Sequence, residues 1–259
     1  FSTTGDGFKS YRDQAVTSVA IGRVQANILD AQLASHKFIK SQDPTLKQQV
    51  DERISSALEL LDEALHLNLP QDQQQILQTI KMQVSDYRGD FADVVSLIDR
   101  RNNTVNTQLD PNGLEMLKSI SNIVDTAADN QNMDVLINAG KVQEHILLAR
   151  LYAVKYLVTN LKDDAEQAIQ ELANIQQQSQ QLKSELDGNA QLSAQYQTFT
   201  DAFMQYQQAF TEIRQTIEKR NELIRTRLDT AGTKTAQSIE QVKLDVKEVQ
   251  DELGPQMVD

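Results

Sequence analysis

Residues that normally end helices are scarce in this chain, which has 4 Pro and 9 Gly among its 259 residues. Tight turns and phosphate-binding loops depend on Gly and Pro, so long helices are the structure that such a chain forms most easily. Most other positions hold good helix formers, aromatic residues make up only 5% of the chain, and no segment shows the alternation of a β-strand. The sequence therefore predicts an all-α protein.

Apolar residues recur at helical spacing between a small number of breaks. Three breaks carry Pro or Gly beside a polar residue that can cap a helix: Asp43-Pro44, Asn68-Leu69-Pro70 and Gly188-Asn189. We expect helices at about 8–42, 46–67, 71–109 and on to 127, 132–160, 164–186 and 190–252. The Leu-Asp-x-x-Gly segments at 109–113 and 228–232 are expected to break or kink the long helices that contain them.

The second half of the chain repeats the first. Residues 22–33 align with residues 140–151 at an offset of 118, with seven identities in twelve positions. Residues 101–113 align with residues 220–232 at an offset of 119, with six identities in thirteen. Two matches at nearly one offset indicate a duplicated unit of two short helices followed by a long one.

The helix lengths indicate how the two halves combine. Each long helix would extend about 80–95 Å at 1.5 Å per residue, about twice the length of its short partners. It can bury its whole apolar face only by serving two bundles. We therefore expect two stacked four-helix bundles that share two long helices, six helices in total. The expected membrane-proximal module is about 1–98 plus 219–259, and the membrane-distal module is about 99–218.

Composition excludes several classes of function. The chain has 25 basic and 37 acidic residues, a net charge of −12, and no Lys/Arg cluster, so we expect no nucleic-acid partner. It has no Cys, and His36, His66 and His145 fit no metal-ligand spacing. No nucleophile elbow or phosphate-binding Gly loop is present. We expect no enzymatic activity, no metal and no cofactor.

Arg150 is the most informative charged residue, because apolar residues lie three and four positions away from it on both sides. Burying an unpaired guanidinium costs several kcal/mol, and Arg cannot lose its proton. An anion must therefore meet it. One interpretation is a structural salt bridge, with Asp110 as partner; the other is a ligand carboxylate held in a bidentate fork.

The two Leu-Asp-x-x-Gly segments are a second indication of binding sites, because a helix interruption frees backbone hydrogen-bonding groups in a bundle core. Counted from the helix tips, the first segment falls level with Arg150 and the second level with Gln32. Aromatic side chains near the first segment could form a wall or simply pack in the core, and arginines near the second could supply the charge that Gln32 lacks. The candidate ligand-binding residues are Arg150, Asn112, Tyr206, Phe210, Gln32, Arg225 and Arg227.

Three parts of the sequence resemble the helical bimodular ligand-binding domain of bacterial chemoreceptors: residues 7–11, the paired Arg-Asn…Leu-Asp-x-x-Gly segments and residues 250–255. The resemblance covers essentially the whole chain. It implies a periplasmic domain between two transmembrane helices, two stacked bundles, a homodimer, and small organic acids as ligands. Relatives hold carboxylates with arginines on the first short helix of a module. Gln32 stands where Arg150 stands in the other half, so the resemblance does not extend to a dicarboxylate site in the membrane-proximal module.

We therefore expect the periplasmic sensor domain of an inner-membrane chemoreceptor, cut from a longer protein because the chain begins with Phe1. A small-molecule ligand would bind in a bundle core and displace one helix. An alternative is the same domain on a histidine kinase, reading a periplasmic binding protein. A helical spacer is a third class, but Arg150 and the paired interruptions argue against it.

Overall fold

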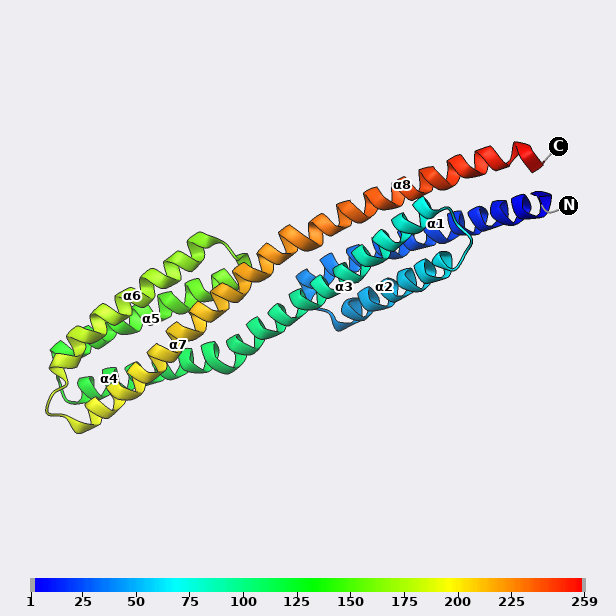
Figure 1. Cartoon of the computed structure of the whole chain (residues 1–259). Helices are drawn as coiled ribbons and strands as arrows, with labels where there is room; N and C mark the ends of the chain where they lie inside the picture. Colours follow the sequence, from blue (N-terminus) through cyan, green and yellow to red (C-terminus); the bar gives the residue numbers. More distant parts are fainter. Residues whose placement is uncertain (1–2, 258–259) are drawn as a thin grey trace. The chain divides into compact units, whose positions relative to one another are not determined.

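A computed structural model describes residues 3–257 of the chain. It is 93% helical and contains no strand in this range, so the predicted all-α class and the six helices are confirmed. Two of the six helices are long and each contains a π-helical segment, η1 or η2. In chain order the helices are α1 (Thr3–Ser41), α2 (Pro44–Leu65), α3 (Gln71–Thr104) with η1 (Val105–Leu109) and α4 (Asp110–Asp129), α5 (Met133–Thr159), α6 (Lys162–Glu185), and α7 (Ala190–Leu223) with η2 (Ile224–Leu228) and α8 (Asp229–Leu253) (Figure 1).

The chain divides into two compact units. Unit 1 comprises residues 1–95 and 221–259, and unit 2 comprises residues 96–220. The sequence placed these divisions at 98/99 and 218/219. Unit 1 is built from α1, α2, most of α3 and α8, and unit 2 from α4, α5, α6 and most of α7. Within unit 1, α1 contacts the short helix Pro255–Met257.

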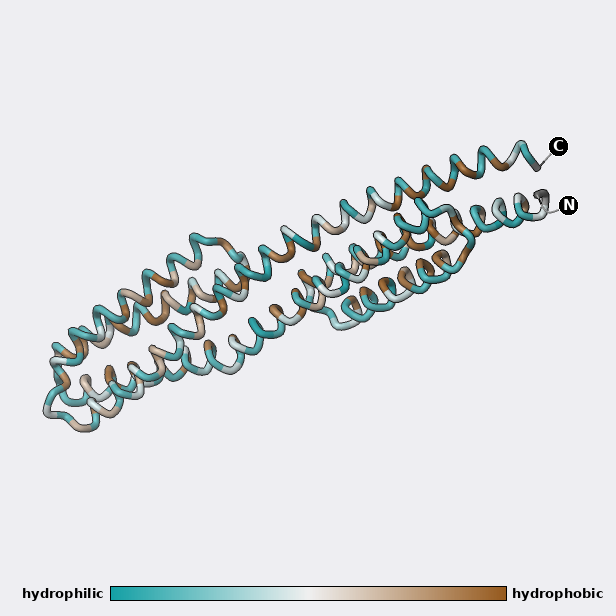
Figure 2. Tube along the Cα trace, in the orientation of Figure 1, coloured by the Kyte–Doolittle hydropathy of each residue, from teal (hydrophilic) through white to brown (hydrophobic). Residues whose placement is uncertain are grey.

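Each unit has an apolar core made by the inward face of every helix, and hydrophobic positions recur along each helix of the trace (Figure 2). The core of unit 1 includes Ile21 and Val24 of α1, Ile54 and Leu61 of α2, Leu77 and Ile80 of α3, and Ile239 and Val242 of α8. The core of unit 2 includes Ile120 and Ile123 of α4, Ile146 of α5, Ile175 of α6, and Phe210 and Ile213 of α7.

Short polar residues set the helix ends, as expected from the breaks. The Asp43 carboxylate accepts a hydrogen bond from the backbone N–H of Thr45, and the adjacent Pro44 opens α2. Asn132 caps α5 in the same way. Asn160 ends α5 in the left-handed conformation (φ 55°), which Asn tolerates better than most residues.

The segments at 109–113 and 228–232, which were expected to break or kink the long helices, are not helix ends, so the expectation of a break was wrong. In each case the helix continues through a π turn that ends at the leucine of the Leu-Asp-x-x-Gly segment, four residues before its glycine. The backbone N–H of Asp110 donates to the carbonyl of Val105, and that of Asp229 donates to Ile224, both across five residues. Pro111 lies in the first turn after η1, where its missing N–H costs least.

Candidate ligand-binding sites

Three residues of unit 2 lie together: Gly113 of α4, Arg150 of α5 and Tyr206 of α7. A Cβ built on Gly113 of α4 would lie 3.1 Å from Nε of Arg150 on α5 and 3.1 Å from Cε2 of Tyr206 on α7. Such separations are tighter than ordinary van der Waals contact. Gly113 is buried, and its lack of a side chain is what lets the guanidinium and the phenol ring approach the α4 backbone.

The Arg150 side chain has no fixed anionic partner. It is partly buried, yet among residues 3–257 it takes part in no hydrogen bond or ion pair. The expected alternative, a salt bridge with Asp110, is not formed in the described part of the chain. Binding of a ligand carboxylate to Arg150 stays a prediction.

The aromatic candidates of unit 2 have different surroundings. Burial raises the pKa of the Tyr206 phenol well above its ordinary value; the Arg150 charge opposes this rise and the Asp110 charge adds to it. Tyr206 therefore lies in the electrostatic field of both charged residues. Phe210, one turn further along α7, makes an edge-to-face contact with Tyr156 at a centroid distance of 5.9 Å. Phe210 is a core residue of unit 2, as the packing interpretation allowed.

The Asn112 side chain forms a hydrogen bond within the π turn and not with Arg150. Its side-chain amide donates a 2.7 Å hydrogen bond to the backbone carbonyl of Gln108 within η1. The Thr107 hydroxyl donates to Asn103 in the same turn of the helix. Side-chain donors thus satisfy carbonyl groups in and next to the widened turn.

Unit 1 contains the same arrangement with different side chains. A Cβ built on Gly232 of α8 would lie 2.6 Å from the amide nitrogen Nε2 of Gln32 on α1. Gln32 and Gly232 are the residues that the internal repeat aligns with Arg150 and Gly113. Counting from the helix tips predicted that each pair lies at the same level, and in both units the paired residues are in contact.

The phenol of Tyr87 completes the arrangement in unit 1, and Tyr87 precedes Tyr206 by the same offset of 119. Burial raises the pKa of Tyr87; a hydrogen bond to Ser35 opposes the rise and the Asp229 charge adds to it. The Tyr87 hydroxyl donates to the Ser35 hydroxyl over 2.9 Å. Our sequence analysis missed Tyr87, Ser35 and Asp229, although applying the offset to Tyr206 and Asp110 would have found Tyr87 and Asp229.

An open cavity of about 1020 Å³ lies beside Gln32 in unit 1. Its walls are formed by α1, α3, η2 and α8. They include two carboxylates, several amides and one phenol but no Lys or Arg. The lining residues are Gln32, His36, Tyr87, Leu228, Asp229, Gly232, Thr233, Ala236, Gln237, Glu240, Gln241 and Leu244.

Arg225 and Arg227 are not among the residues that line this cavity. Arg227 lies 3.4 Å from the carboxylate of Asp90, an ion pair at the surface of unit 1. Both arginines belong to η2. The geometry therefore does not support the hypothesis that these arginines replace the charge missing at Gln32.

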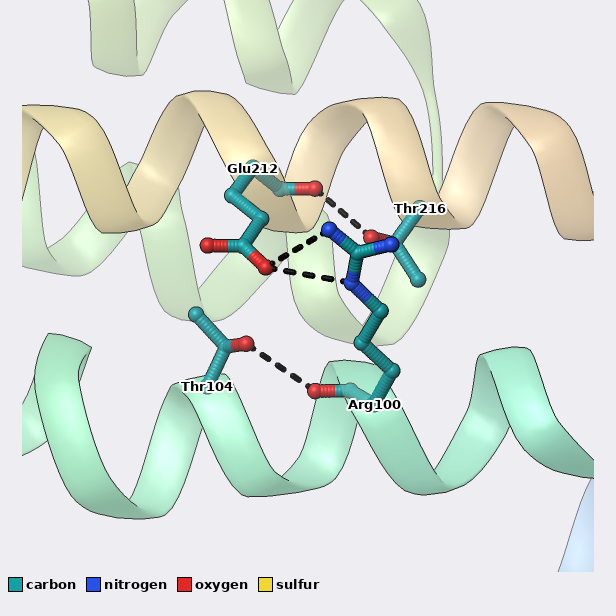
Figure 3. A network of polar contacts seen from close by, with 4 residues as sticks. All are labelled: Arg100, Thr104, Glu212 and Thr216. Atoms are coloured by element: carbon teal, nitrogen blue, oxygen red, sulfur yellow. Dashed lines mark hydrogen bonds and ion pairs between the residues drawn. The ribbon is translucent and has the colours of Figure 1, made fainter.

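Other arginines of unit 2 are engaged within the protein. Figure 3 shows Arg100 of α3 bound to Glu212 of α7 through Nε and Nη2, at 3.1 and 3.0 Å. The Thr104 and Thr216 hydroxyls donate to backbone carbonyls next to this pair. Arg101 donates to the carbonyl of Leu157, and burial lowers its pKa. These contacts distinguish Arg100 and Arg101 from Arg150.

The paired sites lie in a chain that the family model for the helical bimodular sensor domain matches over residues 9–203, well over half of its length. The chain belongs to this family. Comparison with curated proteins gave no match. The helical bimodular sensor domain described here has, within residues 3–257, no helix with the length and apolarity that a membrane crossing requires. The same range holds no cluster of three His, Asp or Glu residues placed to bind a metal ion.

Proposed function

We propose that this helical bimodular sensor domain is the periplasmic part of a transmembrane chemoreceptor, and that unit 2 binds a small organic acid beside Arg150. The observation that carries the ligand class is the partly buried Arg150 guanidinium, which has no hydrogen bond or ion pair among the described residues. A guanidinium stays charged at every physiological pH and needs an anion when it is removed from water. A carboxylate fits its planar fork with two parallel hydrogen bonds.

Binding at this position would be transmitted through helix packing. Arg150 and Tyr206 both rest on Gly113, so a carboxylate that draws the guanidinium toward itself changes the contact between α4 and α5. The π turn η1 ends at Leu109, four residues before Gly113 in the chain. A π turn is a point at which a helix tolerates a change in register. The ligand shifts the conformational equilibrium only by its difference in affinity for the two arrangements.

Unit 1 would bind a less anionic ligand than unit 2. Its cavity has Gln32 in place of Arg150 and exposes the carboxylates of Asp229 and Glu240. Glu240 lies 3.4 Å from Lys243, which offsets part of its charge. An amide can still bind a polar ligand, but it supplies no charge to replace the water lost by a carboxylate.

A thermal-shift panel of organic acids, amino acids and amines at millimolar concentration tests this function. We expect at least one organic acid to raise the melting temperature, and Arg150→Gln to abolish that rise. Gln32→Ala is the control, because it alters the equivalent residue of unit 1 and should leave the acid-dependent rise in place. If no compound stabilises the chain, the proposal of a directly bound small molecule is wrong, and the alternative of a sensor that reads a binding protein is favoured.

Whether the domain controls a chemoreceptor or a histidine kinase is decided by the sequence that follows it in the full protein. A chemoreceptor would continue after residue 259 of the full protein into a methyl-accepting coiled coil, whereas a histidine kinase would continue into a kinase core. Both would use the same Arg150 site, so the panel and the downstream sequence test independent parts of the proposal.

A further inference from the structure

A groove of unit 1 lies between α2 and α3, away from the cavity beside Gln32. It has a volume of about 530 Å³ and is lined only by residues of the ranges 44–54 and 88–95. It shares no lining residue with the cavity beside Gln32. Its volume falls within the range of about 300–1,000 Å³ that small-molecule sites have. We call it the α2–α3 groove.

The buried residues of the α2–α3 groove are apolar. Val50 and Ile54 of α2 and Phe91 and Val95 of α3 line it, and each is at most 8% exposed. The Phe91 ring is held by an edge-to-face contact with Phe38 of α1, at a centroid distance of 5.7 Å. A ligand with an apolar body, such as an aromatic ring, would gain free energy by covering these side chains.

The charged residues that line the groove are two cations and one carboxylate, namely Lys47, Arg88 and Asp51. Two positive charges against one negative charge make the groove locally cationic, in a chain whose net charge is −12. The Lys47 ammonium group takes part in no hydrogen bond or ion pair within residues 3–257. The groove therefore attracts an anion.

Arg88 is only partly satisfied by its neighbours. Its Nη2 donates to the Ser55 hydroxyl and lies 3.4 Å from the Asp51 carboxylate. Its Nε is buried and has no hydrogen-bond partner among the described residues. Asp51 thus makes no two-bond contact with the guanidinium, which is the arrangement that a carboxylate prefers. Because 41% of the Arg88 side chain is exposed, it can turn toward a carboxylate in the groove that accepts from both Nε and Nη2.

The internal repeat shows that the bundle does not need these three charges. Five of the six buried residues of α2 match buried residues of α6 at the offset of 118, and most buried residues of α3 match those of α7 at the offset of 119. At these offsets the three charged positions hold neutral residues in unit 2: Ala165 for Lys47, Ile169 for Asp51 and Gln207 for Arg88. Unit 2 forms the same kind of bundle without them, so packing does not explain the charges of the groove.

We propose that the α2–α3 groove is a second binding site, for a monocarboxylate with an apolar body such as an aromatic carboxylic acid. The carboxylate lies between Lys47 and the Arg88 guanidinium, and the apolar body covers Ile54 and Phe91. A dicarboxylate binds less well, because its second charge would meet apolar side chains or the Asp51 carboxylate. The proposal does not rest on the ligand of unit 2, since every residue of the groove belongs to unit 1.

Titration of naphthoate with the 259-residue chain, followed by fluorescence anisotropy of the naphthyl group, tests the proposal. The chain has no Trp, so the probe is the only group excited at wavelengths that Tyr does not absorb. We expect a saturable rise in anisotropy. The dissociation constant of the neutral amide, naphthamide, should be at least about tenfold higher, because it lacks the charge that the guanidinium binds. Succinate, which has no apolar body, should not displace naphthoate.

Variants locate the bound naphthoate. Arg88→Gln should raise the dissociation constant about ten- to hundredfold, and Lys47→Gln, at an exposed position, about two- to fivefold. Arg53→Gln is the matched control and should change nothing, since the Arg53 side chain is 45% exposed and lies 3.6 Å from Asp30 but does not line the groove. Arg150→Gln should also leave naphthoate binding unchanged, which separates this site from the site proposed in unit 2.

Several results would overturn the proposal. No rise in anisotropy up to about millimolar chain concentration excludes the site. Equal binding of naphthoate and naphthamide excludes recognition of the carboxylate, and equal losses in Arg53→Gln and Arg88→Gln exclude Arg88 as the contact. A loss in Arg150→Gln with none in Arg88→Gln places the acid in unit 2. Circular dichroism checks that each variant is folded, and Lys47→Gln, which breaks no side-chain contact within residues 3–257, carries the test if Arg88→Gln does not fold.

Discussion

Unit 1 and unit 2 place different side chains on the same backbone arrangement. In both units a π turn is followed by a glycine, and a residue of the unit's first short helix packs against that glycine. The packed side chain is Arg150 in unit 2 and Gln32 in unit 1. The duplicated fold thus supplies two similar positions, and a single residue sets whether a position carries a charge.

A second difference concerns the tyrosines. Tyr87 of unit 1 donates a hydrogen bond to Ser35, whereas the residue aligned with Ser35 in unit 2 is Ala153, which offers no hydroxyl. Tyr206 forms no such bond with any residue of the range 3–257 and lies beside Arg150 instead. The hydroxyl of Tyr87 is thus held by its own bundle, whereas the hydroxyl of Tyr206 has no such bond among the described residues.

The largest effect that the comparison predicts is on acid binding by Arg150→Ala. Loss of a charge-assisted contact should weaken affinity by about ten- to hundredfold, which corresponds to roughly 1.5–3 kcal/mol. The free energy of unfolding should change by less than about 0.5 kcal/mol, because no buried carboxylate is left without its partner. Calorimetric titration and urea melts of one protein sample measure both quantities.

The opposite pattern would show that Arg150 is structural. A buried ion pair that loses one member costs roughly 3–5 kcal/mol of stability, with affinity unchanged in the folded fraction. Gln32→Ala provides the matched control in the other unit, where we expect acid binding to unit 2 to remain as it was.

Alkaline pH should destabilise the chain through the two site tyrosines, Tyr87 and Tyr206. Burial raises the pKa of Tyr206 and Tyr87 in the folded chain above the value of about 10 of an exposed phenol. The folded chain therefore keeps a proton on each of these two phenols in a pH range where the unfolded chain releases it. This stability is fully present below about pH 10 and is lost as the pH rises through the folded pKa, by at most about 1.4 kcal/mol per pH unit for each tyrosine.

Urea melts from pH 9 to 11 check this expectation, because this range spans the pKa of about 10 of the unfolded phenol. We expect Tyr206→Phe to reduce the alkaline loss relative to the unaltered chain, and Tyr87→Phe with Tyr206→Phe to reduce it further. An identical alkaline slope in all three proteins would show that neither phenol is held protonated by the fold.

At neutral pH the two tyrosines should differ in the cost of removing the hydroxyl. Tyr87→Phe removes a buried hydrogen bond to Ser35 and should lower the free energy of unfolding by about 0.5–1.5 kcal/mol. Tyr206→Phe, which loses no hydrogen bond within the described residues, should cost less. Equal costs in chemical denaturation would remove this difference between the units.

The smallest predicted effect concerns the glycines. Gly89→Ala, at a helical position with nothing within 4 Å of the new Cβ, should raise the free energy of unfolding by about 0.5–1 kcal/mol. Gly113→Ala should gain less or lose stability, because its Cβ meets Arg150 and Tyr206 at 3.1 Å. An equal gain at both positions would mean that the contact at Gly113 has no energetic consequence.

The fold could be predicted from the sequence because the features that determine it are local. Sparse Pro and Gly predicted helices, and the offset of 118–119 predicted which helices correspond. The interruptions were misjudged for a physical reason: a π turn keeps the helix hydrogen-bonded, so Pro111 and Gly113 leave it continuous. Sequence pattern alone does not distinguish a widened turn from an end.

The candidate sites could be predicted from the sequence only in part. Arg150 stood out because a charge on an apolar stripe is conspicuous, and the repeat led from it to Gln32. Tyr87 and Ser35 looked like ordinary helix residues, since their hydrogen bond joins positions 52 residues apart. Arg225 and Arg227 were nominated from proximity in sequence, but the side on which they leave η2 depends on the turn geometry.

A crystal structure of the chain with the organic acid that stabilises it most tests the central claim most directly. The account predicts a carboxylate in unit 2 with two oxygens about 2.7–2.9 Å from the Arg150 guanidinium nitrogens, above Gly113 and beside Tyr206. Ligand density only beside Gln32 in unit 1, with Arg150 paired to a carboxylate of the protein itself, would contradict it.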